Sequence, residues 1–155
     1  QLEDSSLRKR TLATAQIVLV ASPEYLAKHG TPKTIDDLSD HTLLHYSLTT
    51  SGNVWRLVSP TGEERQVRVG GRLTANNGDA LMLAAEQGLG IAYTPSFILC
   101  DAMKSGRLVQ VLSDLPAREI GIHLVYPEGR YLQPKLRVLI DFLADKYRGR
   151  GPINW

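Results

Sequence analysis

The sequence predicts an α/β fold with a mostly parallel sheet and an antiparallel edge. Short apolar runs that have the character of buried strands alternate along the chain with segments of helical periodicity, and this alternation is typical of α/β proteins. One hairpin signature interrupts the alternation and supplies antiparallel strands. With 155 residues, of which 43% are hydrophobic, the chain is long enough to bury a core without disulfides or a structural metal.

The composition excludes several classes of protein. The formal net charge is +2 and the basic residues are scattered, so we expect no nucleic-acid-binding surface on this chain. No apolar window of about 18 residues is present and Gln1–Asp4 are polar and acidic, so we expect neither a transmembrane helix nor a signal peptide. These features predict a cytoplasmic protein. The one cysteine, Cys100, lies in an apolar stretch and is predicted to be a small buried hydrophobe.

The first predicted strand covers residues 15–21, an apolar run rich in β-branched side chains. Such a run is typical of a strand buried on both faces, as in a parallel sheet. Ser22–Pro23 then begins a short helix, because serine is a good cap and proline suits the first helical turn, and Gly30 ends it. A single helical turn is expected within residues 31–41, and the next strand over residues 42–46.

A hairpin is predicted in the middle of the chain. Residues 54–58 and 65–69 flank a turn at residues 59–63 that carries a proline and a glycine, as tight turns require. Before the hairpin lies a polar, hydroxyl-rich loop at residues 47–53. After it we expect a short strand that contains Leu73.

The clearest predicted helix begins after Asn77, its expected N-cap, and ends at Gly88. Leu89 is expected to fold back on Ala84 in a Schellman motif, which uses a glycine at this position. Residues 90–94 then form a buried strand.

The last third of the chain predicts two further helices and two strands. Ser96 is expected to cap a helix that runs to about residue 105. Strands are expected over residues 108–112 and 120–126. The final helix begins at Pro134 and has one apolar stripe at helical spacing, made of Leu136, Leu139, Ile140, Leu143 and Tyr147.

No residue pattern in the chain predicts catalysis or metal binding. There is no G-x-S-x-G nucleophile elbow, and the four histidines lack the spacing of metal ligands. The glycine pair Gly88–Gly90 lies between a helix and a strand, which is the reverse of a dinucleotide-binding loop. We therefore expect no enzyme activity, no catalytic residues, no metal and no cofactor.

Polar side chains at strand ends predict a binding site. Ligands of open α/β sheets bind beyond the carboxyl ends of strands, and the start of a helix offers unpaired N–H groups to an anion. The structural alternative is that Asn77 and Ser96 only cap helices, and Asp79 opposes anion binding in the first turn of the Asn77 helix. The candidate effector-binding residues are Asn76, Asn77, Tyr93, Thr94, His45 and Tyr46.

An ordered set of short motifs runs along almost the whole chain. The motifs include A-S-P-E-Y-L at residues 21–26, G-T-P at 30–32, A-A-E-Q-G-L-G-I-A at 84–92, G-R-L-V at 106–109 and V-Y-P at 125–127. No single motif is specific, but together they resemble the effector-binding domain of LysR-type transcriptional regulators.

The resemblance implies a periplasmic-binding-protein-like (type 2) fold with one complete lobe and remnants of the other. In that arrangement, residues 1–21 carry the remnant of the first lobe and the first crossover, and residues 22–119 form the second lobe. Residues 120–148 form the second crossover and a C-terminal helix that returns to the first lobe, and residues 149–155 form a tail.

The resemblance also implies a function. A small-molecule effector, an organic or aromatic acid, would bind between the lobes and modulate DNA binding by an N-terminal winged helix-turn-helix that this sequence does not contain. The six candidate residues would supply the second lobe's side of the cleft. We expect a homo-oligomer without membrane contact. The alternative is a transport-associated solute-binding receptor of the same fold.

Overall fold

The computed structural model describes residues 7–70, 73–127 and 133–147. The chain divides into two compact units: unit 2 is built on Gln16–Arg118, and unit 1 on the residues before and after that segment. Strand β1 (Leu7–Ala21) passes from unit 1 into unit 2, and β8 (Arg118–Pro127) carries the chain back. The lobe boundaries that the resemblance implies stay a prediction.

Unit 1 contains the first half of β1, most of β8, and helix α4 (Pro134–Tyr147). β8 pairs with β1, and the His123 ring lies 3.1 Å from the Thr11 hydroxyl across the two strands. The helix begins at Pro134, as predicted. Of its apolar stripe only Ile140 is fully buried, whereas Leu139 remains 50% exposed.

Unit 2 is built on a mixed sheet with the strand order β5-β2-β6-β1-β7. Its short members are β5 (Thr74–Ala75), β2 (Leu43–Tyr46), β6 (Ile91–Pro95) and β7 (Val109–Gln110). The strands β5, β2 and β6 are parallel to one another. β1 is antiparallel to both of its neighbours in this unit, β6 and β7.

Strand β1 corrects the sequence prediction in length and direction. It spans 15 residues rather than the seven of the apolar run, and it runs antiparallel in the middle of the sheet rather than parallel. The prediction of burial on both faces is confirmed for Val18–Ala21, all of which are at most 4% exposed. Two-faced burial makes a strand continuously apolar whichever way its neighbours run, so the pattern carries no information about direction.

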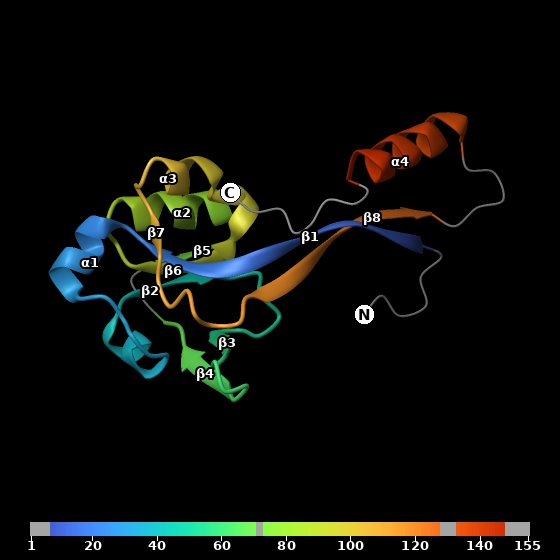
Figure 1. Ribbon diagram of the computed structural model, residues 1–155. Helices are drawn as coiled ribbons and strands as arrows, with labels where there is room; N and C mark the ends of the chain where they lie inside the picture. Colours follow the sequence, from blue (N-terminus) through green and yellow to red (C-terminus); the bar gives the residue numbers. More distant parts are fainter. Residues whose placement is uncertain (1–6, 71–72, 128–132, 148–155) are drawn as a thin grey trace. The chain divides into compact units, whose positions relative to one another are not determined.

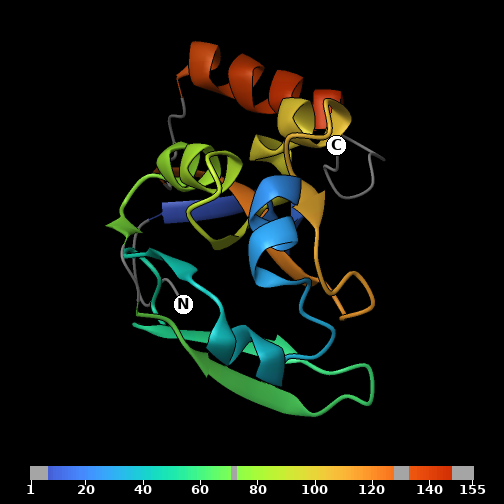
Figure 2. The same cartoon turned by 90° about the vertical axis from the view of Figure 1, so that its left-hand side faces the viewer.

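Alternate residues of β1 enter two separate cores. Val18 and Val20 pack on the side of helices α2 (Gly78–Glu86) and α3 (Cys100–Lys104). Leu19 and Ala21 pack on the opposite side, in a cluster that also contains residues of the hairpin formed by β3 (Val54–Val58) and β4 (Glu64–Arg68) and of the 3-10 helix η1 (Asp36–Asp40). Figures 1 and 2 both show α2 and the hairpin on opposite sides of the unit 2 sheet.

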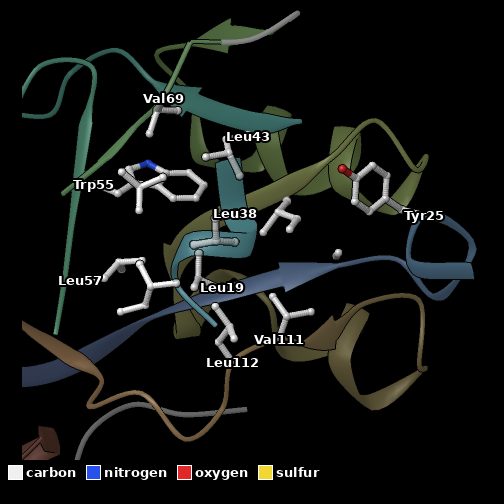
Figure 3. Packing of buried hydrophobic residues seen from close by; sticks show 13 residues of the cluster. Leu19, Tyr25, Leu38, Leu43, Trp55, Leu57, Val69, Val111 and Leu112 are labelled. Atoms are coloured by element: carbon white, nitrogen blue, oxygen red, sulfur yellow. The ribbon is translucent and has the colours of Figure 1, made fainter. Parts of the chain in front are cut away.

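The β3–β4 hairpin supplies large side chains to its core. Strands β3 (Val54–Val58) and β4 (Glu64–Arg68) pair antiparallel, as predicted, with Trp55 opposite Val67. Trp55 and Leu57 point towards Leu19 and Leu38 in Figure 3. The Trp55 ring also lies 5.4 Å from the Tyr93 ring of β6. The hairpin is therefore fixed to the sheet by aromatic and aliphatic contacts.

Two predicted helix caps are confirmed. The Ser22 hydroxyl accepts a hydrogen bond from the Tyr25 N–H at 3.2 Å and so caps α1 (Pro23–His29). The Asn77 side-chain carbonyl accepts hydrogen bonds from two N–H groups at the start of α2, at 2.8 and 3.2 Å. At the end of α2, Gly88 has φ +73°, and the Leu89 N–H donates to the Ala84 carbonyl as in a Schellman motif.

The segment after β6 differs from the prediction. Ser96 lies inside the 3-10 helix η2 (Ser96–Ile98) rather than at a helix cap, and the α-helix begins only at Cys100. Cys100 is part-exposed rather than buried, and its thiol donates to the Phe97 carbonyl at 3.4 Å. The single turn of η2 comes directly after the extended residue Pro95 and delays the start of α3.

Gly90 provides a first test of the packing between β2 and β6. A Cβ at this position would overlap the carbonyl oxygen of Thr42, which accepts the Ile91 N–H at 2.8 Å and so cannot easily move away. Gly90→Ala should therefore lower the free energy of unfolding by about 1–3 kcal/mol, measured by urea denaturation. Gly70→Ala is the control, because a Cβ there meets nothing within 4 Å. Equal stabilities of the two variants would contradict the close approach.

A buried tyrosine links α1 to the segment before β2. The Tyr25 hydroxyl accepts the Thr42 N–H at 2.9 Å and lies 3.1 Å from Nδ1 of His41, while its ring stacks on His29. The hydroxyl can donate its one proton to His41 only when Nδ1 is unprotonated. Burial, followed by the charge of His29, lowers the pKa of His41, and two aspartates act against this shift.

This lowered pKa predicts a pH dependence of stability. The unfolded chain takes up a proton at His41 near its ordinary pKa of 6.5, whereas the folded chain takes it up only at lower pH. The free energy of unfolding should therefore fall as the pH drops below about 6.5, measured by urea denaturation at pH 7.5 and 5.5. His41→Gln should show a smaller fall than the parent chain, and the same fall in both would contradict the assignment.

Candidate functional site

Three parallel strands end at one edge of the unit 2 sheet. β5, β2 and β6 are neighbours, with His45 opposite Thr74 and Leu44 opposite Ala92. The carboxyl ends of these strands lead into the three segments that the sequence singled out. The structure therefore brings all six predicted residues to this edge, where ligands of α/β sheets bind.

The six residues nevertheless divide between the two faces of the sheet. Thr94 is paired with Val18, a residue of the helix side, and a Cβ on Gly78 would lie 3.9 Å from its hydroxyl. Tyr93 is paired with Leu19 and packs on the hairpin side. The sequence identified the edge correctly. Because side chains alternate along a strand, however, neighbouring residues of one segment point to opposite faces of the sheet.

On the helix side the predicted residues have structural roles or are exposed. Asn77 uses its side-chain carbonyl to cap α2, and Asn76 is exposed. Tyr46, which alternation places on the same side as Leu44, is 36% exposed. Thr94 is buried, with 2% exposed. None of these four residues lines the cavity described below.

His45 stands on the hairpin side with Tyr93. Its side chain is 5% exposed, and Nδ1 forms no hydrogen bond with any described residue. Its backbone N–H donates to the Leu73 carbonyl at 3.1 Å, which anchors the end of β2 beside β5. His45 is therefore part of the packed interior at this edge.

A cavity of about 510 Å³ lies on the hairpin side of the sheet, within unit 2. Tyr93 is the one predicted residue that lines it. Most of its wall is apolar, and the polar groups come from the loop after β2, the hairpin, β7 and the start of β8. The lining residues are Ile17, Val18, Leu19, Thr50, Ser51, Arg56, Leu57, Val58, Glu64, Tyr93, Gln110, Leu112, Leu115, Pro116, Ala117 and Arg118.

Local hydrogen bonds fix the loop that borders the cavity. The Ser51 hydroxyl donates to the Val54 carbonyl at 2.9 Å and lies 2.9 Å from the Thr49 hydroxyl. These contacts tie the loop to the start of β3. Thr50 and Ser51 are therefore held at the cavity wall by the same turn that begins the hairpin.

The charged groups of the cavity are two arginines and one glutamate. Nη1 of Arg56 lies 3.9 Å from Oε1 of Glu64 across the hairpin. Arg118 forms no ion pair with any described residue, but its charge acts on the Tyr93 hydroxyl. Burial raises the pKa of Tyr93 and Arg118 partly opposes that shift, so the phenol is protonated at neutral pH and can donate a hydrogen bond.

The sequence did not identify the charged members of this site. Arg56 and Glu64 occupy the outward positions of an amphipathic hairpin, where charged residues are expected anyway, and Arg118 lies just before the strand that the sequence predicts from residue 120. The hydroxyl-rich loop at residues 47–53 was the one available signal for Thr50 and Ser51. In the described part of the chain, no group of three or more potential ligands is placed to hold a metal ion.

The chain matches the protein family described as the LysR substrate binding domain over residues 1–148. It is 36% identical over 135 residues to an uncharacterized HTH-type transcriptional regulator of Haemophilus influenzae, covering 87% of this chain and 46% of that protein. It is 31% identical over 147 residues to the HTH-type transcriptional regulator CrgA of Neisseria meningitidis, covering 94% and 48% respectively. The chain thus spans about half the length of these curated relatives.

Solved structures agree with the family match. The regulatory domain of CrgA from Neisseria meningitidis has a TM-score of 0.82 at 30% identity, covering 95% of this chain and 72% of that one. Full-length AphB, described as a Vibrio cholerae virulence activator of the same family, also has a TM-score of 0.82, at 33% identity, covering 93% and 49%. These matches confirm the predicted periplasmic-binding-protein-like fold.

The family match decides between the functional classes that the sequence left open. It favours a regulator over the solute-binding receptor of the same fold, and because the family is a non-enzymatic one, the expectation that the chain is not an enzyme is confirmed. None of the described helices is long and apolar enough to cross a membrane. The chain belongs to the LysR substrate-binding domain family and is an effector-binding regulatory domain of the LysR type.

Proposed function

We propose that this domain senses a small organic acid, aromatic or aliphatic, and that the cavity on the hairpin side of unit 2 holds it. The cavity itself is the observation that supports this proposal. Its volume of about 510 Å³ suits a small ligand, and its wall combines apolar side chains with polar and charged ones that can orient a ligand. The net charge of +1 from Arg56, Arg118 and Glu64 favours an acid over a neutral or basic ligand.

The position of the cavity supports the same proposal. Tyr93 lies near the carboxyl end of β6, and Thr50 and Ser51 follow the carboxyl end of β2. At Arg118 the cavity reaches the last residue of unit 2 before the chain returns to unit 1. A ligand here would contact the strand that joins the two units, so its binding would bias a movement at that joint that changes these contacts.

The wider proposal concerns a whole protein that contains this chain. The matched relatives are named HTH-type transcriptional regulators and are about twice as long. In this proposal a DNA-binding segment lies outside residues 1–155, and the protein acts as a homo-oligomer in the bacterial cytoplasm. Binding of the effector in this cavity changes the conformation of the protein and thereby the spacing of the DNA-binding segments.

A cavity-filling variant tests the site. Small carboxylic acids, screened by protein-observed NMR at neutral pH, should perturb Tyr93, Leu57 and Leu115 together. Ala117→Trp should weaken binding of any acid found by about tenfold or more, because the indole occupies the ligand's space and a tenfold loss needs only about 1.4 kcal/mol. Ala27→Trp, on the exposed surface of α1, is the matched control and should bind as the parent chain does.

The same experiment shows which face of the sheet holds the ligand. Perturbations at Asn76, Asn77 and Thr94 that survive Ala117→Trp would place the ligand at the start of α2, as the polar helix start suggests, and would remove the cavity from the proposal.

A further inference from the structure

Among the described residues, the charged side chains of the cavity leave one positive charge, that of the exposed Arg118, without a protein counterion. Arg56 is paired with Glu64 at 3.9 Å, and Arg118 forms no ion pair with any described residue. Two arginines and one glutamate sum to a charge of +1, and the lining set contains no other acidic or basic side chain. A ligand with one negative charge would neutralise the cavity, whereas a ligand with two would leave an excess.

Arg118 and Tyr93 are suited to bind a carboxylate together. The guanidinium offers a fork of N–H donors that matches the two oxygens of a carboxylate. The phenol hydroxyl of Tyr93 adds one hydrogen-bond donor. Both residues line the same cavity, and the charge of Arg118 acts on the Tyr93 hydroxyl. The apolar remainder of the wall, such as Leu57 and Leu112, would contact a hydrocarbon body.

We propose that the cavity selects small monocarboxylates with a hydrocarbon body, that Arg118 and Tyr93 bind the carboxylate, and that Glu64 discriminates against dicarboxylates by occupying Arg56. This inference rests on the proposed function and specifies the chemical class of its effector. It also assigns opposite roles to the two arginines, because Arg118 is open to a ligand and Arg56 already has an internal carboxylate.

The discrimination follows from the position of Glu64 in the hairpin. Glu64 is opposite Val58, two residues along β3 from Arg56, so the pair is a diagonal cross-strand contact on one face of the hairpin. A second ligand carboxylate would reach Arg56 only beside the negative charge of Glu64. Because both side chains are more than half exposed, at 59% and 56%, solvent screens the repulsion and the selectivity should be several-fold rather than absolute.

The test uses three probes of equal carbon number: hexanoate, adipate and hexan-1-ol. Their affinities for the chain are measured by titration at pH 7.5, with NMR to locate the bound probe. Hexanoate should bind at least about fivefold more tightly than adipate or hexan-1-ol. Arg118→Gln should lower the affinity for hexanoate about tenfold or more, to that of hexan-1-ol, because only the carboxylate uses the guanidinium.

Glu64→Gln should remove most or all of the preference for hexanoate over adipate. Removing this charge frees Arg56 and raises the net charge of the cavity to about +2, so the ratio of adipate to hexanoate affinity should rise by about fivefold to tenfold. Glu63→Gln is the matched control. Glu63 is the neighbouring exposed glutamate, is paired with Arg65 at 3.2 Å and does not line the cavity, so its loss should leave the ratio unchanged.

The outcomes separate this inference from the proposed function. If none of the probes or other small acids binds in the cavity, the proposed function fails there and the inference fails with it. If probes bind in the cavity but hexan-1-ol equals hexanoate, or if Glu64→Gln and Glu63→Gln give the same ratio, the effector cavity stands and the charge selection is overturned.

Discussion

The structure depends on the burial of β1 on both of its faces. Because successive side chains of a strand point to opposite sides, Val18 and Val20 join the helix-side core while Leu19 and Ala21 join the hairpin-side core. Strand β1 therefore contributes to both hydrophobic clusters, as do β2 with Leu43 and Leu44 and β6 with Ile91 and Ala92. The same strand continues into unit 1, so the element that organises the sheet is also one of the two connections between the units.

This arrangement of strands determines the geometry of the candidate site. The strands β5, β2 and β6 run parallel and end at one edge, while β1 runs antiparallel beside β6 and brings Ile17–Leu19 to the cavity. The hairpin is packed against the sheet through Trp55 and forms the opposite wall with Leu57 and Val58. The cavity is thus formed by elements that are distant in sequence and are joined by strand pairing and by the packing of the hairpin-side core.

The chemistry of the cavity is consistent with a sensor that binds without reacting. Its polar groups are donors and charges on an apolar wall, an arrangement that orients a ligand. Arg118 connects the cavity to the strand that returns to unit 1, because it lines the cavity and is the first residue of β8. A sensor needs a link of this kind, since a ligand shifts a conformational equilibrium only through contacts that differ between the two states.

The sequence by itself determined most of the elements, the helix caps at Ser22 and Asn77, and the family. Local signals sufficed for these, because a cap such as Asn77, a Schellman glycine such as Gly88 and a hairpin turn depend on residues within a few positions of one another. Ordered motifs also identified the fold. Only the tertiary structure decided the direction of β1, the separation of Tyr93 from Thr94 onto opposite faces, and the grouping of Arg56, Glu64 and Arg118 around one cavity. Those features arise from packing between distant segments, and apolar burial records how deeply a strand lies but not which neighbours surround it or which way they run.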